Sequence, residues 1–252
     1  MVKVRYGRVM KFISVKANAF ISKKLEVRTL TGFAAAAIAI LTLTEFFVKV
    51  SIGTRPQLGD SSALVQFINA NSTPTLAVII IDTLLMSCLI IFFAGFRQLI
   101  IKANRTLSWI TDLAFGAGLV FVALTLIGDA MDGGAALDTV GTYAADPSVL
   151  RALTEGHMLL FGSIGCILTA LVTATFAYTT FASKAVPTWT GWVGYAVAVM
   201  NLLAVPTVFG GTSATSFVSA GGMGVTLLAT FPFLLWVVAV GVVTVRNKPH
   251  AQ

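Results

Sequence analysis

The sequence predicts an all-α protein, a polytopic bundle of about six transmembrane helices with both termini in the cytoplasm. Three observations lead to this fold class. Of the 252 residues, 57% are hydrophobic and only 11% are charged, whereas about a quarter of the residues of a soluble domain are charged. The hydrophobic residues gather in six long stretches, and most Lys and Arg residues lie on one side of them. Because so few polar side chains are available to cover a core, the outside of the bundle must face lipid.

Each of the six stretches is long enough to cross a bilayer. A helix rises about 1.5 Å per residue and the hydrocarbon layer is about 30 Å thick, so one crossing needs about 20 apolar residues. The stretches lack the alternation of barrel strands, and an open strand would leave backbone groups unpaired in lipid, so all six are expected to be helices. Their approximate ranges are 29–51, 74–100, 109–131, 155–182, 188–209 and 221–245.

The basic residues predict the orientation of the bundle. Lys and Arg accumulate on the cytoplasmic side of membrane proteins, and 14 of the 17 in this chain fall on the side of the amino terminus. Only Lys49, Arg55 and Arg151 fall on the other side. This excess and the even number of helices both predict that the two termini are cytoplasmic.

The chain divides into a basic segment, residues 1–28, a six-helix domain, residues 29–246, and a cytoplasmic tail, residues 247–252. The basic segment is expected to contact anionic lipid headgroups and not nucleic acid, because a hydrophobic helix follows it directly. Its basic residues are Lys3, Arg5, Arg8, Lys11, Lys16, Lys23, Lys24 and Arg28. Either a helix lying in the interface or a charged tail held near the membrane fits this pattern.

Three connecting segments on the side away from the termini carry capping and turn residues. Asp60 is expected to cap a short helix over residues 63–70 that lies on the membrane surface or folds over the mouth of the bundle. Asp146 and Pro147 are of the types that begin a helix, so the fourth helix is expected to start outside the bilayer. The Gly, Ser and Thr residues within 210–220 fit either a flexible connection or a re-entrant segment.

Several short motifs resemble a bacterial six-helix membrane protein family known as domain of unknown function 4386. They are Glu45-Phe46-Phe47-Val48-Lys49, Gly59-Asp60, Asn69, Asp82-Thr83-Leu84-Leu85 and Pro187-Thr188-Trp189-Thr190-Gly191-Trp192. The resemblance covers most of the chain after residue 29 and implies six helices in a bacterial cytoplasmic membrane. It implies no activity, because the function of that family is unassigned.

Ionisable residues inside the spans are the best candidates for chemistry, since an Asp or Lys at the centre of a membrane helix costs roughly 2.5–3.5 kcal/mol. Glu45 and Lys49 are four residues apart at the end of the first helix and are expected to form an ion pair. Asp82 has no charged neighbour in its own helix. It is either a structural hydrogen-bonding residue that faces the bundle interior or a proton or cation site.

Four further ionisable residues, Asp129, Asp132, Glu155 and His157, are expected near the external surface, where they form an acidic vestibule. A solvated acidic rim is the simplest interpretation, and a divalent-cation site is the alternative. No spacing typical of a catalytic metal site is present, and no cofactor is expected. The candidate residues for a proton, cation or ligand site are therefore Asp82, Glu45, Asp129 and His157.

Two function classes remain open, a non-catalytic accessory or scaffold subunit of a larger membrane assembly and a transporter. Few polar groups lie inside the spans, and small residues repeat along the fourth helix, so the accessory role is favoured, with other membrane subunits or further copies of the chain as partners. A transporter of ions, small solutes or lipid-like ligands would use Asp82 and the acidic vestibule. An enzyme is less expected, because the nearest match to a serine-hydrolase turn, residues 211–215, lacks the final glycine.

Overall fold

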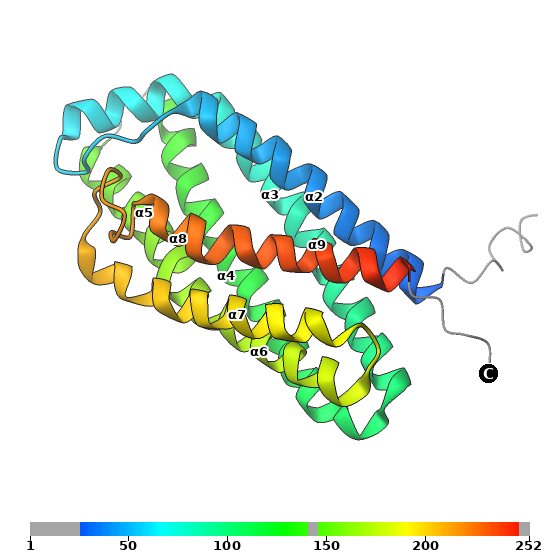
Figure 1. Ribbon diagram of the computed structural model, residues 1–252. Coiled ribbons are helices and arrows are strands. Elements are labelled where there is room, and N and C mark those ends of the chain that lie inside the picture. Colours follow the sequence, from blue (N-terminus) through cyan, green and yellow to red (C-terminus); the bar gives the residue numbers. More distant parts are fainter. Residues whose placement is uncertain (1–25, 141–145, 247–252) are drawn as a thin grey trace, which may run out of the picture.

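The computed structural model describes residues 26–140 and 146–246, which form a helical bundle (Figure 1). No strand occurs in these residues, and six helical spans are long and apolar enough to cross a membrane, which confirms the predicted all-α bundle of six helices. The cytoplasmic position of the termini stays a prediction. The elements are α2 (Val27–Ile52), α3 (Ser61–Ala103), η1 (Arg105–Leu107), α4 (Ser108–Val140), α5 (Pro147–Leu159), η2 (Leu160–Ile164), α6 (Gly165–Ser183), α7 (Thr188–Ala204), η3 (Val205–Gly210), α8 (Met223–Val225), η4 (Thr226–Thr230) and α9 (Phe231–Arg246).

Three of the spans depart from a regular α-helix. The fourth span joins α5 and α6 through the π-helical turn η2, and the fifth continues from α7 into the 3-10 turn η3. The sixth span joins α8 and α9 through a second π-helical turn, η4. Such turns inside helices often mark functional sites, because they break the regular backbone ladder and redirect side chains.

The first and last described helices meet at one end of the bundle (Figure 1). Arg28 at the start of α2 donates a hydrogen bond from Nη1 to the Thr244 carbonyl near the end of α9, at 3.4 Å. This end is referred to below as the terminal end. The opposite end carries residues 53–60 and 211–222 and is referred to as the loop end.

The predicted short helix over residues 63–70 is wrong as a separate element, because α3 runs without interruption for 43 residues from Ser61. Several polar residues that are typical of loops lie within this helix, and their side chains donate to its backbone carbonyls. The Asn71 side chain donates to the Phe67 carbonyl at 2.8 Å, and the Ser72 hydroxyl donates to the Asn69 carbonyl at 3.2 Å. Pro74 also lies inside α3, where the missing backbone donor favours a bend.

The first turns of α3 fold over the loop end of the bundle. Leu64 and Ile68 are buried in a small hydrophobic cluster with Ala135 of α4 and Leu150 of α5. This segment was expected either on the membrane surface or over the mouth of the bundle, and its packing against α4 and α5 fits the second position. The cluster joins three helices beside the polar residues described below.

The predicted helix caps are confirmed at Asp60 and Asp146. The Asp60 carboxylate accepts a hydrogen bond from the Ala63 backbone N–H at 3.0 Å, and Asp146 accepts one from the Ser148 backbone N–H at 2.8 Å. Pro147 is the first residue of α5, as expected. Between η3 and α8, residues 211–222 form a compact series of turns in which the Ala220 N–H donates to the Gly211 carbonyl at 2.8 Å.

We expect the cap at Asp60 to weaken in acid. The hydrogen bond from Ala63 holds the pKa of this carboxyl below its ordinary value of 3.8. Because the pKa is lower in the folded state, the stabilisation is present above pH 3.8 and is lost as the pH falls below it. Backbone amides in the first turn of α3 should therefore lose protection against hydrogen exchange in acid, after correction for the pH dependence of exchange in an unstructured peptide. Asp60→Ala should remove this pH dependence, and its persistence in the variant would contradict the assignment.

An aromatic core holds the helices together toward the terminal end. Phe92 and Phe96 of α3 contact Trp236 of α9, with ring centroids 6.5 and 6.4 Å apart, and Phe96 also contacts Phe176 of α6 at 5.0 Å. The Trp236 indole donates to the Thr190 carbonyl of α7 at 2.9 Å. The core thus ties four helices together and satisfies its one polar ring group.

Candidate functional site

A cavity of about 350 Å³ lies at the loop end of the bundle. Its wall is formed by the end of α2 and the loop after it, by α3 and α4, by α5 and η2, and by residues 214–226. The ionisable residues on this wall are Lys49, Arg55, Asp82, Asp129, Asp132 and His157. The structure therefore brings together three of the four predicted site residues, and the fourth, Glu45, lines an adjoining smaller cavity.

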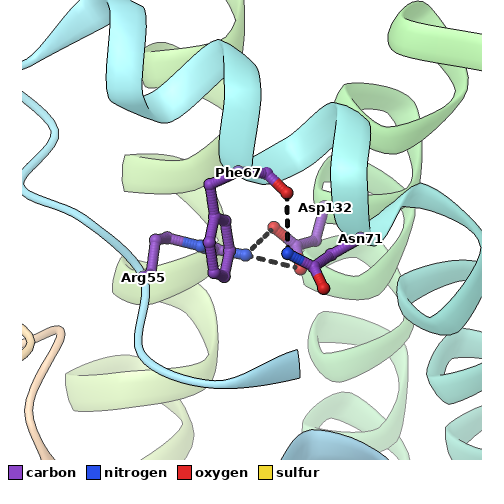
Figure 2. A network of polar contacts seen from close by, with 4 residues as sticks. All are labelled: Arg55, Phe67, Asn71 and Asp132. Carbon is purple, nitrogen blue, oxygen red and sulfur yellow. Dashed lines mark hydrogen bonds and ion pairs between the residues drawn. The ribbon is translucent and has the colours of Figure 1, made fainter. Parts of the chain in front are cut away.

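Arg55 joins the loop after α2 to α4. Its Nη2 atom lies 2.9 Å from Oδ1 and 3.1 Å from Oδ2 of Asp132. Figure 2 shows this pair beside Phe67 and Asn71 of α3. The Arg55 and Asp132 side chains are only 20% and 16% exposed, so the charges depend on each other for compensation.

Glu45 and Lys49 form the predicted ion pair one turn apart on α2. The Lys49 ammonium also lies over the ring of Phe161 in η2, with Nζ 5.7 Å from the ring centroid. A cation at this distance is attracted by the negative face of the ring. The pair therefore places one positive charge between an acidic side chain and an aromatic wall.

Asp82 is buried in α3, with only 4% of its surface exposed. It lines both the large cavity and the smaller one of about 40 Å³. The charged groups that face it are Lys49, Glu45 and Asp129. Both interpretations of Asp82 stay open: its contact with the Glu45 carboxyl fits a structural hydrogen-bonding residue that faces the bundle interior, and its position between two cavities fits a proton or cation site.

Asp129 does not lie on a solvated rim, contrary to the expectation from the sequence. Its side chain is 3% exposed, and its Oδ2 atom has no hydrogen-bond partner among the described residues. The reason is that α4 does not end near residue 131 but continues to Val140, so Asp129 remains within the packed part of the bundle. Asp129 is therefore a buried carboxylate on the cavity wall with unused bonding capacity.

His157 of α5 also lines the cavity, and its Nδ1 atom is buried without a partner in the described chain. The imidazole stacks on Phe161, with centroids 5.7 Å apart and an angle of 10° between the rings. Glu155, predicted to share the acidic vestibule, instead pairs with Arg151 at 2.8 Å and is 39% exposed. The vestibule therefore lacks one of its four expected members.

The charges around the two cavities do not balance. Among the residues that the structure describes, four carboxylates on these walls face two permanent cations, and each cation already has its own partner, Arg55 with Asp132 and Lys49 with Glu45. Of these four carboxylates, Asp82 and Asp129 form no ion pair with a described residue. A charged group in the membrane is costly unless compensated, so these two acids are expected to take up protons or a cationic ligand.

The smaller cavity extends from Asp82 toward the middle of the bundle. Its polar lining includes Thr169 of α6, Asn201 of α7 and Thr230 of η4, and it shares Phe161 with the large cavity. The Asn201 side chain donates to the Val197 carbonyl at 2.9 Å, so its amide oxygen is the atom left for other contacts.

Sequence reasoning missed Arg55 and Phe161 as site residues. Arg55 was counted only for orientation, and no local signal predicts a partner 77 residues away. The small residues on the fourth span are Gly162, Cys166, Ala170, Thr173 and Ala177. They are buried, which fits the expected packing role, but Gly162 lines the large cavity and Cys166 lines the smaller one.

The predicted lipid-headgroup residues Lys3, Arg5, Arg8, Lys11, Lys16, Lys23 and Lys24 lie outside the described residues. Arg28 is described and lies at the terminal end against Thr244. Within residues 26–140 and 146–246, no group of three or more His, Cys, Asp or Glu side chains is arranged to hold a metal ion. Comparisons with protein-family models, curated proteins and solved structures give no match for this chain. The resemblance to the six-helix family therefore stays an expectation.

Proposed function

We propose that this protein is a membrane transporter that binds a small solute in the loop-end cavity and uses Asp82 and Asp129 as its proton- or cation-coupling groups. The observation that carries the proposal is the buried, partly unpartnered carboxylate of Asp129 on the wall of a cavity of about 350 Å³. Pockets of this size accommodate small organic molecules.

The departures from regular α-helix around the cavity support transport over simple binding. Both π-helical turns contribute residues to the cavity walls, Phe161 and Gly162 from η2 and Thr226 from η4. Gly162 has φ −76° and ψ −110°, outside the helical region, so the fourth span is broken there. In many transporters, discontinuous helices surround the substrate site near the middle of the membrane.

The orientation of the cavity follows from the distribution of basic residues. With 14 of 17 Lys and Arg residues on the side of the amino terminus, we place the terminal end in the cytoplasm and the cavity mouth on the outside. A bacterial cytoplasmic membrane is the location that fits the family resemblance. The proposed role is thus the capture of an external solute in the large cavity, with Asp82 at the boundary to the smaller cavity.

Replacing Asp129 by Asn is expected to abolish coupled transport, because the amide cannot carry the charge or the proton. The measurement is the current of proteoliposomes on a solid-supported membrane after jumps in pH and in small amines, amino acids, carboxylates and sugars. We expect one solute class to give a current that falls at least tenfold in Asp129→Asn and in Asp82→Asn.

Asp112→Asn is the matched control, since Asp112 is 50% exposed and pairs with Arg97 away from both cavities. Its current should equal that of the unmodified protein. A current that survives Asp129→Asn, or no current above empty liposomes with any solute, would reject transport.

The accessory-subunit role favoured by the sequence remains the second candidate. Its support is α2, which is the least buried of the six spans and exposes Phe33, Ile40 and Phe47. Such a face suits another subunit as well as lipid. Native mass spectrometry after gentle solubilisation distinguishes the roles, because stoichiometric foreign subunits are expected only of an accessory protein.

A further inference from the structure

We propose that the loop-end cavity binds a small organic cation, whose ammonium group is held by Asp129 and Asp82 and whose apolar part lies against Phe67 and Phe161. This inference rests on the proposed function for its cavity, but it concerns binding and does not require transport. It names a ligand class that follows from charge, burial and the chemistry of the wall.

Charge is the first step of the argument. Arg55 and Lys49 are each engaged by a carboxylate, so neither is free to hold an anionic ligand. Asp82 and Asp129, 4% and 3% exposed, form no ion pair with another described residue, and the Asp82 side chain instead contacts the Glu45 carboxyl. A ligand that enters this wall therefore meets two buried acidic groups whose charge no ion pair cancels, which favours a cation over an anion or a neutral molecule.

Unused hydrogen-bonding capacity is the second step. Asp129 Oδ2 is buried and has no partner in the described chain, and the side chain lines the cavity. A buried acceptor without a partner destabilises the protein, and a charged one does so more strongly. An ammonium donor at this oxygen would remove that destabilisation and form a charge-assisted hydrogen bond.

The aromatic wall is the third step and selects an organic cation. Phe67 and Phe161 line the same cavity, and the Lys49 ammonium already lies over Phe161. An aromatic face attracts alkylammonium groups, which bury their methyl or methylene groups against it. The remaining wall includes Ile52, Val78 and Ile79, which suit the apolar part of such a ligand.

Inorganic cations fit this site less well. A calcium ion needs six to eight oxygen ligands at about 2.3–2.6 Å, and magnesium keeps a compact octahedral shell. No group of three or more acidic, His or Cys side chains in the described residues is close enough to hold a metal. The cavity of about 350 Å³ also exceeds the volume of a bare ion several times and matches a small organic molecule.

The experiment compares a cation with a neutral molecule of the same shape. Phenethylamine, whose ammonium group can donate to Asp129, and 2-phenylethanol differ by an ammonium in place of a hydroxyl, so their affinities isolate the effect of charge. Binding is measured by isothermal titration calorimetry on the full chain in lipid nanodiscs at neutral pH. We expect phenethylamine to bind at least tenfold more tightly than its neutral counterpart.

Variants assign the effect to residues. Asp129→Asn should weaken cation binding at least tenfold, Asp129→Glu should retain most of it, and Asp112→Asn should leave it unchanged. Phe161→Leu should weaken it severalfold. Thermal unfolding of each variant shows whether it is folded, and the charge-retaining Asp129→Glu keeps the test valid if Asp129→Asn is unstable.

The outcomes separate this inference from the proposed function. Cation binding without any flux would overturn transport and leave the inference standing. Flux of a sugar or carboxylate without binding of phenethylamine would overturn the inference and leave transport standing. Equal binding of phenethylamine and 2-phenylethanol, or cation binding that is insensitive to Asp129→Asn, would overturn the inference directly.

Discussion

Gly241→Leu is expected to destabilise the bundle more than any other single substitution considered for this chain. Gly241 of α9 packs directly on Ala35 of α2, and a Cβ atom built at this glycine would lie 2.1 Å from the Ala35 Cβ. Ala35 is 1% exposed, and its Cβ cannot move without the backbone of α2. The two helices must therefore separate, which removes part of the contact that closes the bundle between its first and last spans.

The expected cost is about 3 kcal/mol or more, at the upper end of typical overpacking effects. For a chain of this size, a loss of 3 kcal/mol corresponds to a fall in the melting temperature of about 6–12 °C. The measurement is thermal unfolding in detergent micelles followed by intrinsic fluorescence. Because leucine is a better helix former than glycine, any fall must come from the clash and not from helix propensity.

Gly116→Leu provides the control for this prediction. Gly116 is an exposed residue of α4, and a Cβ built there has nothing within 4 Å. The same substitution should leave the melting temperature unchanged or raise it slightly. If Gly241→Leu and Gly116→Leu behave alike, the close packing of α2 and α9 is not a source of stability.

Features set by neighbouring residues were predictable from the sequence. The six apolar stretches became the six spans, the caps at Asp60 and Asp146 formed, and the pair of Glu45 and Lys49 formed because one helical turn separates the two residues. Each of these depends on interactions over a few residues. Such interactions are present in any helix with this sequence, whatever the rest of the chain does.

The end of α4 was predicted wrongly, because Gly133 and Gly134 resemble a turn. In the structure they continue the helix, and a Cβ at Gly133 would lie 2.9 Å from Ile79 Cδ1 of α3. The glycine therefore serves the close approach of two helices, a role that becomes visible only when the partner helix is placed. Because the helix was predicted to end near residue 131, Asp129 was also predicted to be solvated, although it is buried.

Two of the three basic residues on the side away from the termini have an explanation in the cavity. Lys49 and Arg55 each compensate a carboxylate on or near its wall. Lys49 and Arg55 therefore lie on the side with few basic residues because they neutralise acidic side chains there. The sequence held this signal, but the pairing of Arg55 with Asp132 spans 77 residues and could not be assigned from spacing.

Arg55→Ala is expected to destabilise the protein by about 2–3 kcal/mol, because it leaves the Asp132 carboxylate at the loop end without its cation. Removing one member of a fully buried pair costs about 3–5 kcal/mol. The cost is smaller here, since the two side chains keep 20% and 16% of their exposure. The measurement is the melting temperature in nanodiscs, combined with hydrogen exchange of residues 53–60, which should accelerate when the loop loses its contact with α4.

The double variant Arg55→Leu/Asp132→Asn decides whether charge or packing is responsible. If the loss in Arg55→Ala arises from an uncompensated carboxylate, neutralising both partners should recover at least half of the lost stability. Arg151→Ala is the exposed counterpart, because Arg151 and Glu155 are 54% and 39% exposed, and it should cost less than about 0.5 kcal/mol. If Arg55→Ala and Arg151→Ala lowered the stability equally, Asp132 would be fully solvated. The assignment of Asp82 and Asp129 as the unpaired acids, which assumes that Arg55 is engaged by Asp132, would then be wrong.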